Sequence, residues 1–279
     1  MSTSATSETD PFWSDILTSA QQITAQVGQR LLQDFGQVHA NEKADGSLVT
    51  ASDRWADEAL RTALLTAFPD HGVLSEEVEH HFPDTDWCWI IDPIDGTTNF
   101  TRGIPLWAIS LGLLYRGTPV FGYVYLPPLE QSFYGYWAGD SGLTLPSGAY
   151  LNGKPIHTSP AAPAKNQFFS LCARSTAVLA KPFPCKIRIL GTAAYNLLTV
   201  AAGYTLGAVE ATPKIWDIAA AWPILQAAGG CWVPLDRSEP FPLSVGADYG
   251  KRAYPTLAVS QAQWVDQFQP LVQPVFSPS

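Results

Sequence analysis

The amino-acid sequence predicts a protein of mixed α and β structure, with helices and an antiparallel sheet in its N-terminal half and alternating helices and strands in its C-terminal half. Apolar residues first recur at helical spacing, and short apolar runs rich in β-forming residues follow. Beyond Asn152 the two patterns alternate, as in α/β proteins. We therefore expect a flexible tail over residues 1–10, an N-terminal half over residues 11–148 and a C-terminal half over residues 149–279.

Two helices are expected in the N-terminal half. After Pro11, apolar residues recur every three or four positions, as on the buried face of a helix. These residues are Phe12, Ile16, Ala20, Ile23, Val27 and Leu31. The second helix fits residues 53–68 and ends at Pro69, and an Asp-Gly pair predicts a turn over residues 43–47.

Short apolar runs predict the strands. In the N-terminal half they cover residues 87–91, 107–115, 119–126 and 131–137. In the C-terminal half they cover residues 168–172, 186–190, 206–210, 231–233 and 256–259. Helices are expected over residues 192–202 and 217–228, and a last helix precedes a Pro-rich tail.

Composition and charge limit the kinds of function. Hydrophobic residues make up 46% of the 279 residues and charged residues 15%, which is typical of a globular protein. A net charge of −9 argues against non-specific binding to nucleic acid or anionic membranes. We find no apolar stretch near the roughly 18 residues of a membrane span and no secretory signal, so we expect a cytoplasmic protein.

The most informative segment covers residues 92–100, Asp-Pro-Ile-Asp-Gly-Thr-Thr-Asn-Phe, directly after the apolar run at 87–91. Strands of this kind end in surface loops, where sites are often built. We expect Asp92 and Asp95 to lie in a turn where both cannot face a core, so they need a cation between them or shift in pKa. Mg²⁺ accepts such oxygen ligands, including a backbone carbonyl such as that of Ile94. A solvated turn explains the same residues equally well.

Further carboxylates occur elsewhere in the chain. Glu76, Glu77 and Glu79 precede the first strand, and Asp217 begins the predicted helix over 217–228. Singly, the former read as a solvated acidic loop and the latter as a helix N-cap. Their combination favours a metal site.

The combined motifs resemble those of the inositol monophosphatase family. Four parts of the chain match. The first is an N-terminal pattern of Lys43, Asp45, residues 49–50 and Asp53, and the second is residues 75–77. The third is residues 89–100, and the fourth is residues 216–221 together with 227–230. They occur in the family's order, and the resemblance spans about residues 12–260. It implies a layered αβαβα sugar-phosphatase fold, a homodimer, sensitivity to lithium, and hydrolysis of a small phosphorylated metabolite with two or three Mg²⁺ ions.

The resemblance also implies roles for particular residues. The implied metal ligands are Glu76, Asp92, Asp95, Asp217 and the carbonyl of Ile94. Glu76, Thr97 and Asp53 would activate the attacking water. The substrate would lie against Gly96, Thr97, Gly191, Thr192, Ala193 and Glu210.

The substrate itself is left open by the sequence. Glu210 can accept hydrogen bonds from hydroxyls, which favours inositol monophosphate. Arg174 and the basic segment over residues 181–188 are either a solvated edge or a contact for an anionic substrate or a second subunit. Histidinol phosphate, adenosine 3′,5′-bisphosphate and fructose 1,6-bisphosphate are the alternatives that other relatives suggest. A catalytically silent regulatory protein of the same fold is a further alternative, against which the complete ligand set argues.

His and Cys residues suggest little chemistry of their own. His80 and His81 lie beside acidic residues, but adjacent histidines rarely bind one ion, so a zinc site is the weaker interpretation. The four cysteines show no CxxC pairing and are expected to be free thiols.

Overall fold

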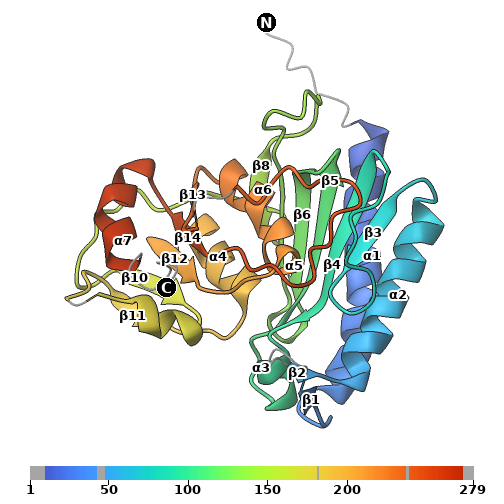
Figure 1. The fold of residues 1–279 in the computed structure, drawn as a ribbon, viewed down its shortest axis with the longest axis horizontal. Coiled ribbons are helices and arrows are strands. Elements are labelled where there is room, and N and C mark those ends of the chain that lie inside the picture. The colour runs from blue at the N-terminus through green and yellow to red at the C-terminus, as the bar shows by residue number, and fades with distance from the viewer. Residues whose placement is uncertain (1–9, 43–47, 181, 237–238, 273–279) are drawn as a thin grey trace, which may run out of the picture.

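The protein has five layers in the order α, β, α, β, α (Figure 1). The computed structural model describes residues 10–42, 48–180, 182–236 and 239–272. The layered αβαβα architecture expected from the sequence is confirmed. Several predicted segments lie outside the described residues. They are the N-terminal tail up to residue 9, the turn over residues 43–47, Lys181 and the Pro-rich tail from residue 273.

The large sheet has seven strands in the order β3-β4-β5-β6-β7-β8-β9. These are β3 (Gly72–Ser75), β4 (Trp87–Asp95), β5 (Ala108–Tyr115), β6 (Thr118–Leu126), β7 (Gln131–Tyr136), β8 (Gly148–Leu151) and β9 (Lys154–Ile156). β3 runs parallel to β4, and the other neighbouring pairs are antiparallel. The expectation of a purely antiparallel sheet is therefore wrong at β3. The short strands β3, β8 and β9, and the two-residue pair β1 (Asn41–Glu42) and β2 (Leu48–Val49), were not predicted because they lack apolar runs.

Helices α1 (Pro11–Asp34) and α2 (Ala51–Ala67) cover one face of the large sheet. α2 begins two residues before its predicted start because Thr50 caps it. The Thr50 hydroxyl accepts the N–H groups of Ser52 and Asp53, and the Asp53 carboxylate accepts the Thr50 N–H at 2.7 Å. This capping box fixes Asp53 in the first turn of α2, where its side chain is buried.

The small sheet has five strands in the order β11-β10-β12-β14-β13. They are β10 (Phe168–Leu171), β11 (Lys186–Arg188), β12 (Gly207–Glu210), β13 (Cys231–Pro234) and β14 (Thr256–Val259). All five were predicted. β11, β10 and β12 are parallel, whereas β14 pairs antiparallel with both β12 and β13. Helix α7 (Val265–Val272) covers the outer face.

Three helices fill the layer between the sheets. They are α4 (Ala193–Ala201), α5 (Ile215–Ala219) and α6 (Ala221–Ala227). The single helix predicted over residues 217–228 is two helices that meet at Ala220. Pro223 explains the break, because it has no N–H to donate to the carbonyl of Ala219. α5 also begins earlier than predicted, so Asp217 occupies its first turn rather than its N-cap.

Strand β4 continues through residues that the sequence predicted to form a surface turn. Asp92 and Asp95 are 1% and 5% exposed, so the expectation that both cannot lie inside the protein is wrong. The pairing of β4 with β5 shifts register between them, around Pro93, which cannot donate to the sheet. Residues three apart point to opposite faces of a regular strand, and this irregularity allows both carboxylates to face one site.

Candidate active site

A cavity of about 550 Å³ lies between the end of β4 in the large sheet and the ends of β10 and β12 in the small sheet. All but one of the predicted site residues line it. They are Glu76, Asp92, Ile94, Asp95, Gly96, Thr97, Gly191, Thr192, Ala193, Glu210 and Asp217. The remaining residue, Asp53, is fully buried and reaches the cavity wall through Thr97.

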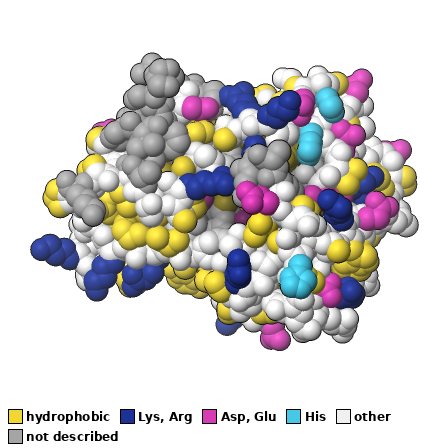
Figure 2. All heavy atoms as spheres, turned by 60° about the horizontal axis from the view of Figure 1, so that its bottom comes forward, with side chains coloured by type: hydrophobic (Ala, Val, Ile, Leu, Met, Phe, Trp, Pro, Cys, Tyr) yellow, Lys and Arg dark blue, Asp and Glu magenta, His cyan; other side chains and the backbone are white. Residues whose placement is uncertain are grey.

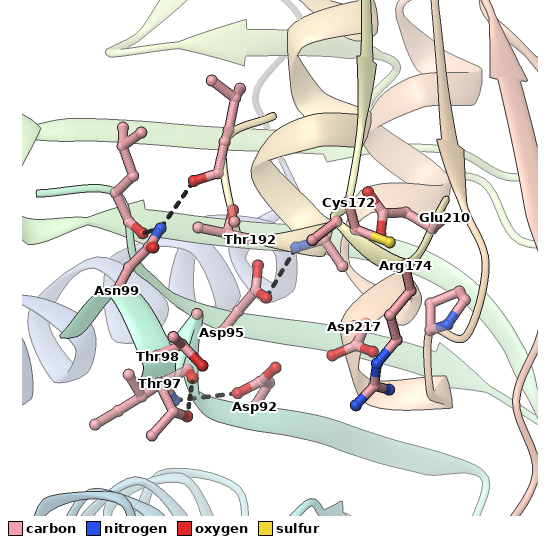
Figure 3. Close-up of a pocket in the computed structure, with 18 of the residues that line it drawn as sticks. Asp92, Asp95, Thr97, Thr98, Asn99, Cys172, Arg174, Thr192, Glu210 and Asp217 are labelled. Carbon is pink, nitrogen blue, oxygen red and sulfur yellow. Dashed lines mark hydrogen bonds between the residues drawn. The ribbon is translucent and has the colours of Figure 1, made fainter. Parts of the chain in front are cut away.

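Three carboxylates meet on one side of the cavity. Asp92 and Asp95 come from the end of β4, and Asp217 comes from the first turn of α5. One oxygen of each lies within 4.8 Å of the others, and Figure 3 shows all three side chains facing the same space. Asp217 also accepts the N–H of Lys214 at 2.6 Å, which fixes its carboxylate at the start of α5. Three hard oxygen donors at this separation are the kind of group that holds a divalent cation.

The charges in this cluster oppose one another. Burial raises the pKa of Asp92 well above its ordinary value, and the charges of Glu76, Asp95 and Asp217 raise it further. Burial, followed by the charge of Asp217, raises the pKa of Asp95 to about 7. Without a cation, carboxylates so placed cannot all be ionised at neutral pH.

Glu76 enters the cavity from the turn after β3. Its backbone N–H donates to the carbonyl of Ile91 at 3.1 Å, which joins the turn to β4. Its carbonyl pairs with Nε2 of His80 at 2.8 Å, and the His80 ring stacks on Trp216 with the centroids 5.5 Å apart. His80 therefore ties the Glu76 turn to α5, beside Asp217.

Thr97 connects the cavity to the interior. Its hydroxyl lies 3.1 Å from Oδ1 of Asp53 and 3.1 Å from the carbonyl oxygen of Ile94, and it can donate to either. Burial raises the pKa of Asp53, whereas the hydrogen bonds from Thr50 and Thr97 act in the opposite direction. With either acceptor, the proton of Thr97 is engaged within the protein, which leaves lone pairs of its oxygen for a group in the cavity.

Asp95 also joins strand β4 to helix α4 in the middle layer. Its carboxylate oxygens accept the N–H groups of Ala193 and Ala194 at 3.0 and 2.8 Å, at the start of α4, which Thr192 caps. These bonds favour the ionised carboxylate and act against the rise in its pKa. The N–H of Ala193 is therefore already engaged within the protein.

A side-chain amide reinforces this junction. Asn99, in the short helix α3 (Thr97–Thr101), donates to the carbonyls of Leu106 and Leu190 at 2.7 and 2.8 Å. Gly191 adopts a φ of +83°, and a Cβ there would lie 2.6 Å from the Asn99 amide. Only glycine fits this close approach without displacement.

The opposite side of the cavity carries Glu210, at the end of β12. Its side chain is 3% exposed, and Oε1 accepts a hydrogen bond from Nδ2 of Asn196 at 2.7 Å. Burial raises its pKa well above the ordinary value, and the neighbouring Cys172 adds to the rise. Figure 3 shows Cys172 and Glu210 side by side, away from Thr97.

Arg174 supplies positive charge at the cavity. Among the described residues that line the cavity, it is the one Lys or Arg, and its Nη1 donates to Oγ1 of Thr212 at 3.1 Å. On the face shown in Figure 2, Lys and Arg are interspersed with Asp and Glu over the right-hand part, whereas several Lys and Arg side chains lie near one another at the left edge. Of the basic segment predicted to contact an anion, Arg188 instead stacks on Phe168, 4.1 Å from the ring centroid.

Sequence reasoning missed several residues of this site. Ile104 and Ile189, which are 44% and 52% exposed, form an apolar part of the lining, and Cys172 lies beside Glu210. Asn99 also lines the cavity, whereas Asn196 lies behind the lining. Asn99 could have been found from its place within the motif, whereas the other four carry no local signal.

Other expectations have simpler outcomes. The described carboxylate cluster contains no His, and His81 is an exposed residue 3.3 Å from Glu79. The four cysteines are free, as expected: Cys88, Cys172, Cys185 and Cys231. Among the described residues, no helix is both long and apolar enough to cross a membrane.

Comparison with known proteins identifies the family and agrees with the layered fold. The model of the inositol monophosphatase family matches residues 13–265. A fructose-1,6-bisphosphatase/inositol-1-monophosphatase of Aquifex aeolicus is 35% identical over 231 residues, 78% of this chain and 84% of that protein. A histidinol-phosphatase of Chlorobaculum parvum is 32% identical over 225 residues, 76% of this chain and 83% of that protein. The solved structure of an IMPase of Thermotoga maritima has a TM-score of 0.78 at 29% identity and covers 94% of this chain and 98% of that one.

The family match, the layered fold and the carboxylate cluster together define a metal-dependent hydrolase of phosphate monoesters. The chain belongs to the inositol monophosphatase family.

Proposed function

We propose that the protein hydrolyses a small polyol phosphate with Mg²⁺, and that inositol monophosphate is the first substrate to test. The observation that carries this proposal is a single cavity with three clustered carboxylates on one side and the buried acceptor Glu210 on the other. The carboxylates suit a cation that binds phosphate, and Glu210 suits a hydroxyl-bearing alcohol.

The donor set fits Mg²⁺. The residues that would hold two or three ions are Glu76, Asp92, Asp95, Asp217 and the carbonyl of Ile94. Their oxygens are hard ligands, and a cation would relieve the repulsion that raises the pKa values of Asp92 and Asp95. Bound there, Mg²⁺ would supply positive charge for the phosphate and lower the pKa of the attacking water.

The chain's own residues would position the reacting groups. Glu76 would accept a proton from the attacking water. Thr97 would orient that water with an oxygen lone pair, because its own proton is donated to Asp53 or to the carbonyl of Ile94. The backbone N–H groups of Gly96 and Thr97 would bind the phosphate. Since phosphoryl transfer has a loose transition state, this positioning accounts for most of the protein's contribution.

The substrate's hydroxyls would lie between Glu210 and the segment over residues 191–193. The alternatives that lack a ring of hydroxyls, histidinol phosphate above all, would make less use of Glu210.

Arg174 favours a second candidate substrate class. Its guanidinium lines the cavity on the side away from Thr97 (Figure 3), where it can bind a second anionic group. Fructose 1,6-bisphosphate and adenosine 3′,5′-bisphosphate carry such a group. A catalytically silent protein is the weaker alternative, because the full set of proposed ligands surrounds one cavity.

Phosphate release with Mg²⁺ tests the proposal across four substrates: inositol 1-phosphate, histidinol phosphate, fructose 1,6-bisphosphate and adenosine 3′,5′-bisphosphate. We expect inositol 1-phosphate to be cleaved with the highest kcat/KM. The variant Glu210→Gln should lower this preference while leaving the hydrolysis of p-nitrophenyl phosphate nearly unchanged, and Glu58→Gln on the exposed face of α2 is the control. No release from any of the four would contradict the proposed activity. The homodimer, the cytoplasmic location and lithium sensitivity stay predictions.

A further inference from the structure

Asn196 is a buried polar residue that the phosphatase chemistry does not use. It lies in α4 with its side chain fully buried, and the cavity is lined by Glu210 and not by Asn196. Its one hydrogen bond to a side chain runs from Nδ2 to Oε1 of Glu210 at 2.7 Å, the short distance of a bond to a charged acceptor. Asn196 therefore reaches the site only through Glu210.

The orientation of this amide is costly. Oδ1 of Asn196 is buried and has no hydrogen-bond partner among the described residues. A buried acceptor without a hydrogen-bond partner destabilises the folded state. The opposite amide orientation would turn two oxygen acceptors toward each other. The amide of Asn196 therefore donates to the carboxylate of Glu210 while its own carbonyl oxygen is left without a hydrogen bond.

Glu210 needs such a partner. Its carboxylate is buried at the end of β12, where burial raises its pKa, and the bond from Asn196 acts in the opposite direction. Its other close neighbour, Cys172, does not favour the charged form. An ionised carboxylate in a fixed direction is the better acceptor for hydroxyls.

The same helix also contacts the metal side of the cavity. The N–H groups of Ala193 and Ala194 bind Asp95, and Asn196 follows within the same helical turn. α4 therefore sets the spacing between the carboxylate cluster and Glu210.

We infer that Asn196 is a positioning residue, whose amide holds the Glu210 carboxylate in the direction that accepts the substrate's hydroxyls and so sets the preference for polyol phosphates. This inference rests on the proposed hydroxyl-binding role of Glu210. It does not depend on which polyol carries the phosphate.

Two substrates separate this role from a structural one. In Asn196→Leu, which is close in volume, kcat/KM for inositol 1-phosphate should fall about tenfold to hundredfold, mainly through KM. Hydrolysis of p-nitrophenyl phosphate, which offers Glu210 no hydroxyl, should change by less than about threefold. Asn196→Ala should give the same pattern, which identifies the lost donor rather than the changed volume. Thr199→Val, one turn along α4, is the control and should leave both activities unchanged.

Combining variants tests the pathway of the effect. In a Glu210→Gln background, Asn196→Leu should have little further effect on inositol 1-phosphate, because the two residues act as one unit. An equal loss on both substrates, or fully additive effects, would overturn the inference.

Binding of free myo-inositol, measured by thermal unfolding, tests the role of Asn196 without relying on phosphatase activity. If no substrate is hydrolysed, the proposed function fails, and the rise in melting temperature with free myo-inositol decides the role of Asn196. A rise in the wild type that shrinks in Asn196→Leu would support the inference. An unchanged rise in the variant, or none in the wild type, would refute it.

Discussion

The two sides of the cavity differ in how their residues are supplied. The metal side draws Asp92, Asp95 and Thr97 from one continuous segment, the end of β4 and the start of α3. The substrate side draws Arg174, Glu210 and their neighbours from loops and strand ends dispersed over the C-terminal half. The metal side gathers carboxylates that repel one another, with Asp92 and Asp95 buried, whereas the substrate side mixes an acid, a cation and exposed apolar side chains.

This difference separates two kinds of constraint. On the metal side, each carboxylate is held by backbone N–H groups or by its strand, so a small change in any of them alters the whole cluster. On the substrate side, Arg174 and Ile189 are exposed and can change singly. We therefore expect variants of the metal side to affect all substrates and variants of the substrate side to affect only some.

The largest effect is expected for Asp95→Asn. Loss of this proposed ligand should reduce Mg²⁺-dependent phosphate release by at least about 10³-fold on every substrate, because metal catalysis supplies several kcal/mol of transition-state stabilisation. Thermal unfolding without Mg²⁺ should still show a folded protein, because the variant loses the hydrogen bond to one of the two N–H groups of Ala193 and Ala194 but also removes a repelling charge. Asp86→Asn, at an exposed ion pair with Arg116, is the control. Near-normal turnover in Asp95→Asn would contradict the assignment of Asp95 as a metal ligand that every substrate requires.

Thr97→Val should have the next largest effect. It removes the hydroxyl that contacts Asp53 and Ile94 but keeps the side-chain shape, so kcat should fall about 10²-fold on all substrates. The Mg²⁺ concentration for half-maximal rate should change little. Thr101→Val, in the same helix but with an exposed hydrogen bond to Thr98, should retain full activity. A loss confined to polyol phosphates would instead assign Thr97 to the substrate side.

Arg174→Gln should act on substrates selectively. Removing a charged hydrogen bond should lower kcat/KM for fructose 1,6-bisphosphate about tenfold relative to p-nitrophenyl phosphate. Arg188→Gln, which alters a guanidinium stacked on Phe168 outside the cavity lining, is the matched control. Equal losses on both substrates would show that Arg174 does not discriminate between them.

The smallest effect is expected for the pH dependence of folding stability, compared with and without Mg²⁺. The folded-state pKa of Asp95, about 7, lies above its unfolded value, so its contribution to stability is complete below pH 4 and is lost as pH rises toward 7. His71 acts oppositely: burial lowers its pKa to about 4, so its contribution is lost as pH falls from 6.5. The difference between the stability-versus-pH profiles of the wild type and Asp95→Asn reports the contribution of Asp95. We expect the stabilisation by Mg²⁺ to be a few degrees larger at pH 8 than at pH 5 in thermal unfolding, and an equal shift at both would contradict it.

Sequence patterns predicted the fold better than its details. The stripe from Phe12 to Leu31 and the apolar runs were long enough to identify α1 and most strands. The short strands β3, β8 and β9 escaped because their residues alternate little or are exposed. The break at Ala220 could have been expected from Pro223, which removes a helical hydrogen bond.

Some features of the candidate site could likewise be predicted from the sequence, and others could not. The carboxylates were found because they lie in one motif, but their burial was not, since it depends on a register shift between β4 and β5. The roles of Asn99 and Asn196 depend on partners 91 and 14 residues away, Leu190 and Glu210. Contacts of this kind leave no local pattern.

The bonds between β4 and α4 also have a consequence for how the chain folds. Asp95 meets Ala193 and Ala194 across 98 and 99 residues of sequence. Closing so long a loop costs chain entropy that is recovered only when both sheets have formed and docked. We therefore expect hydrolytic competence to be among the last properties that a refolding chain acquires, after its helices and sheets have formed.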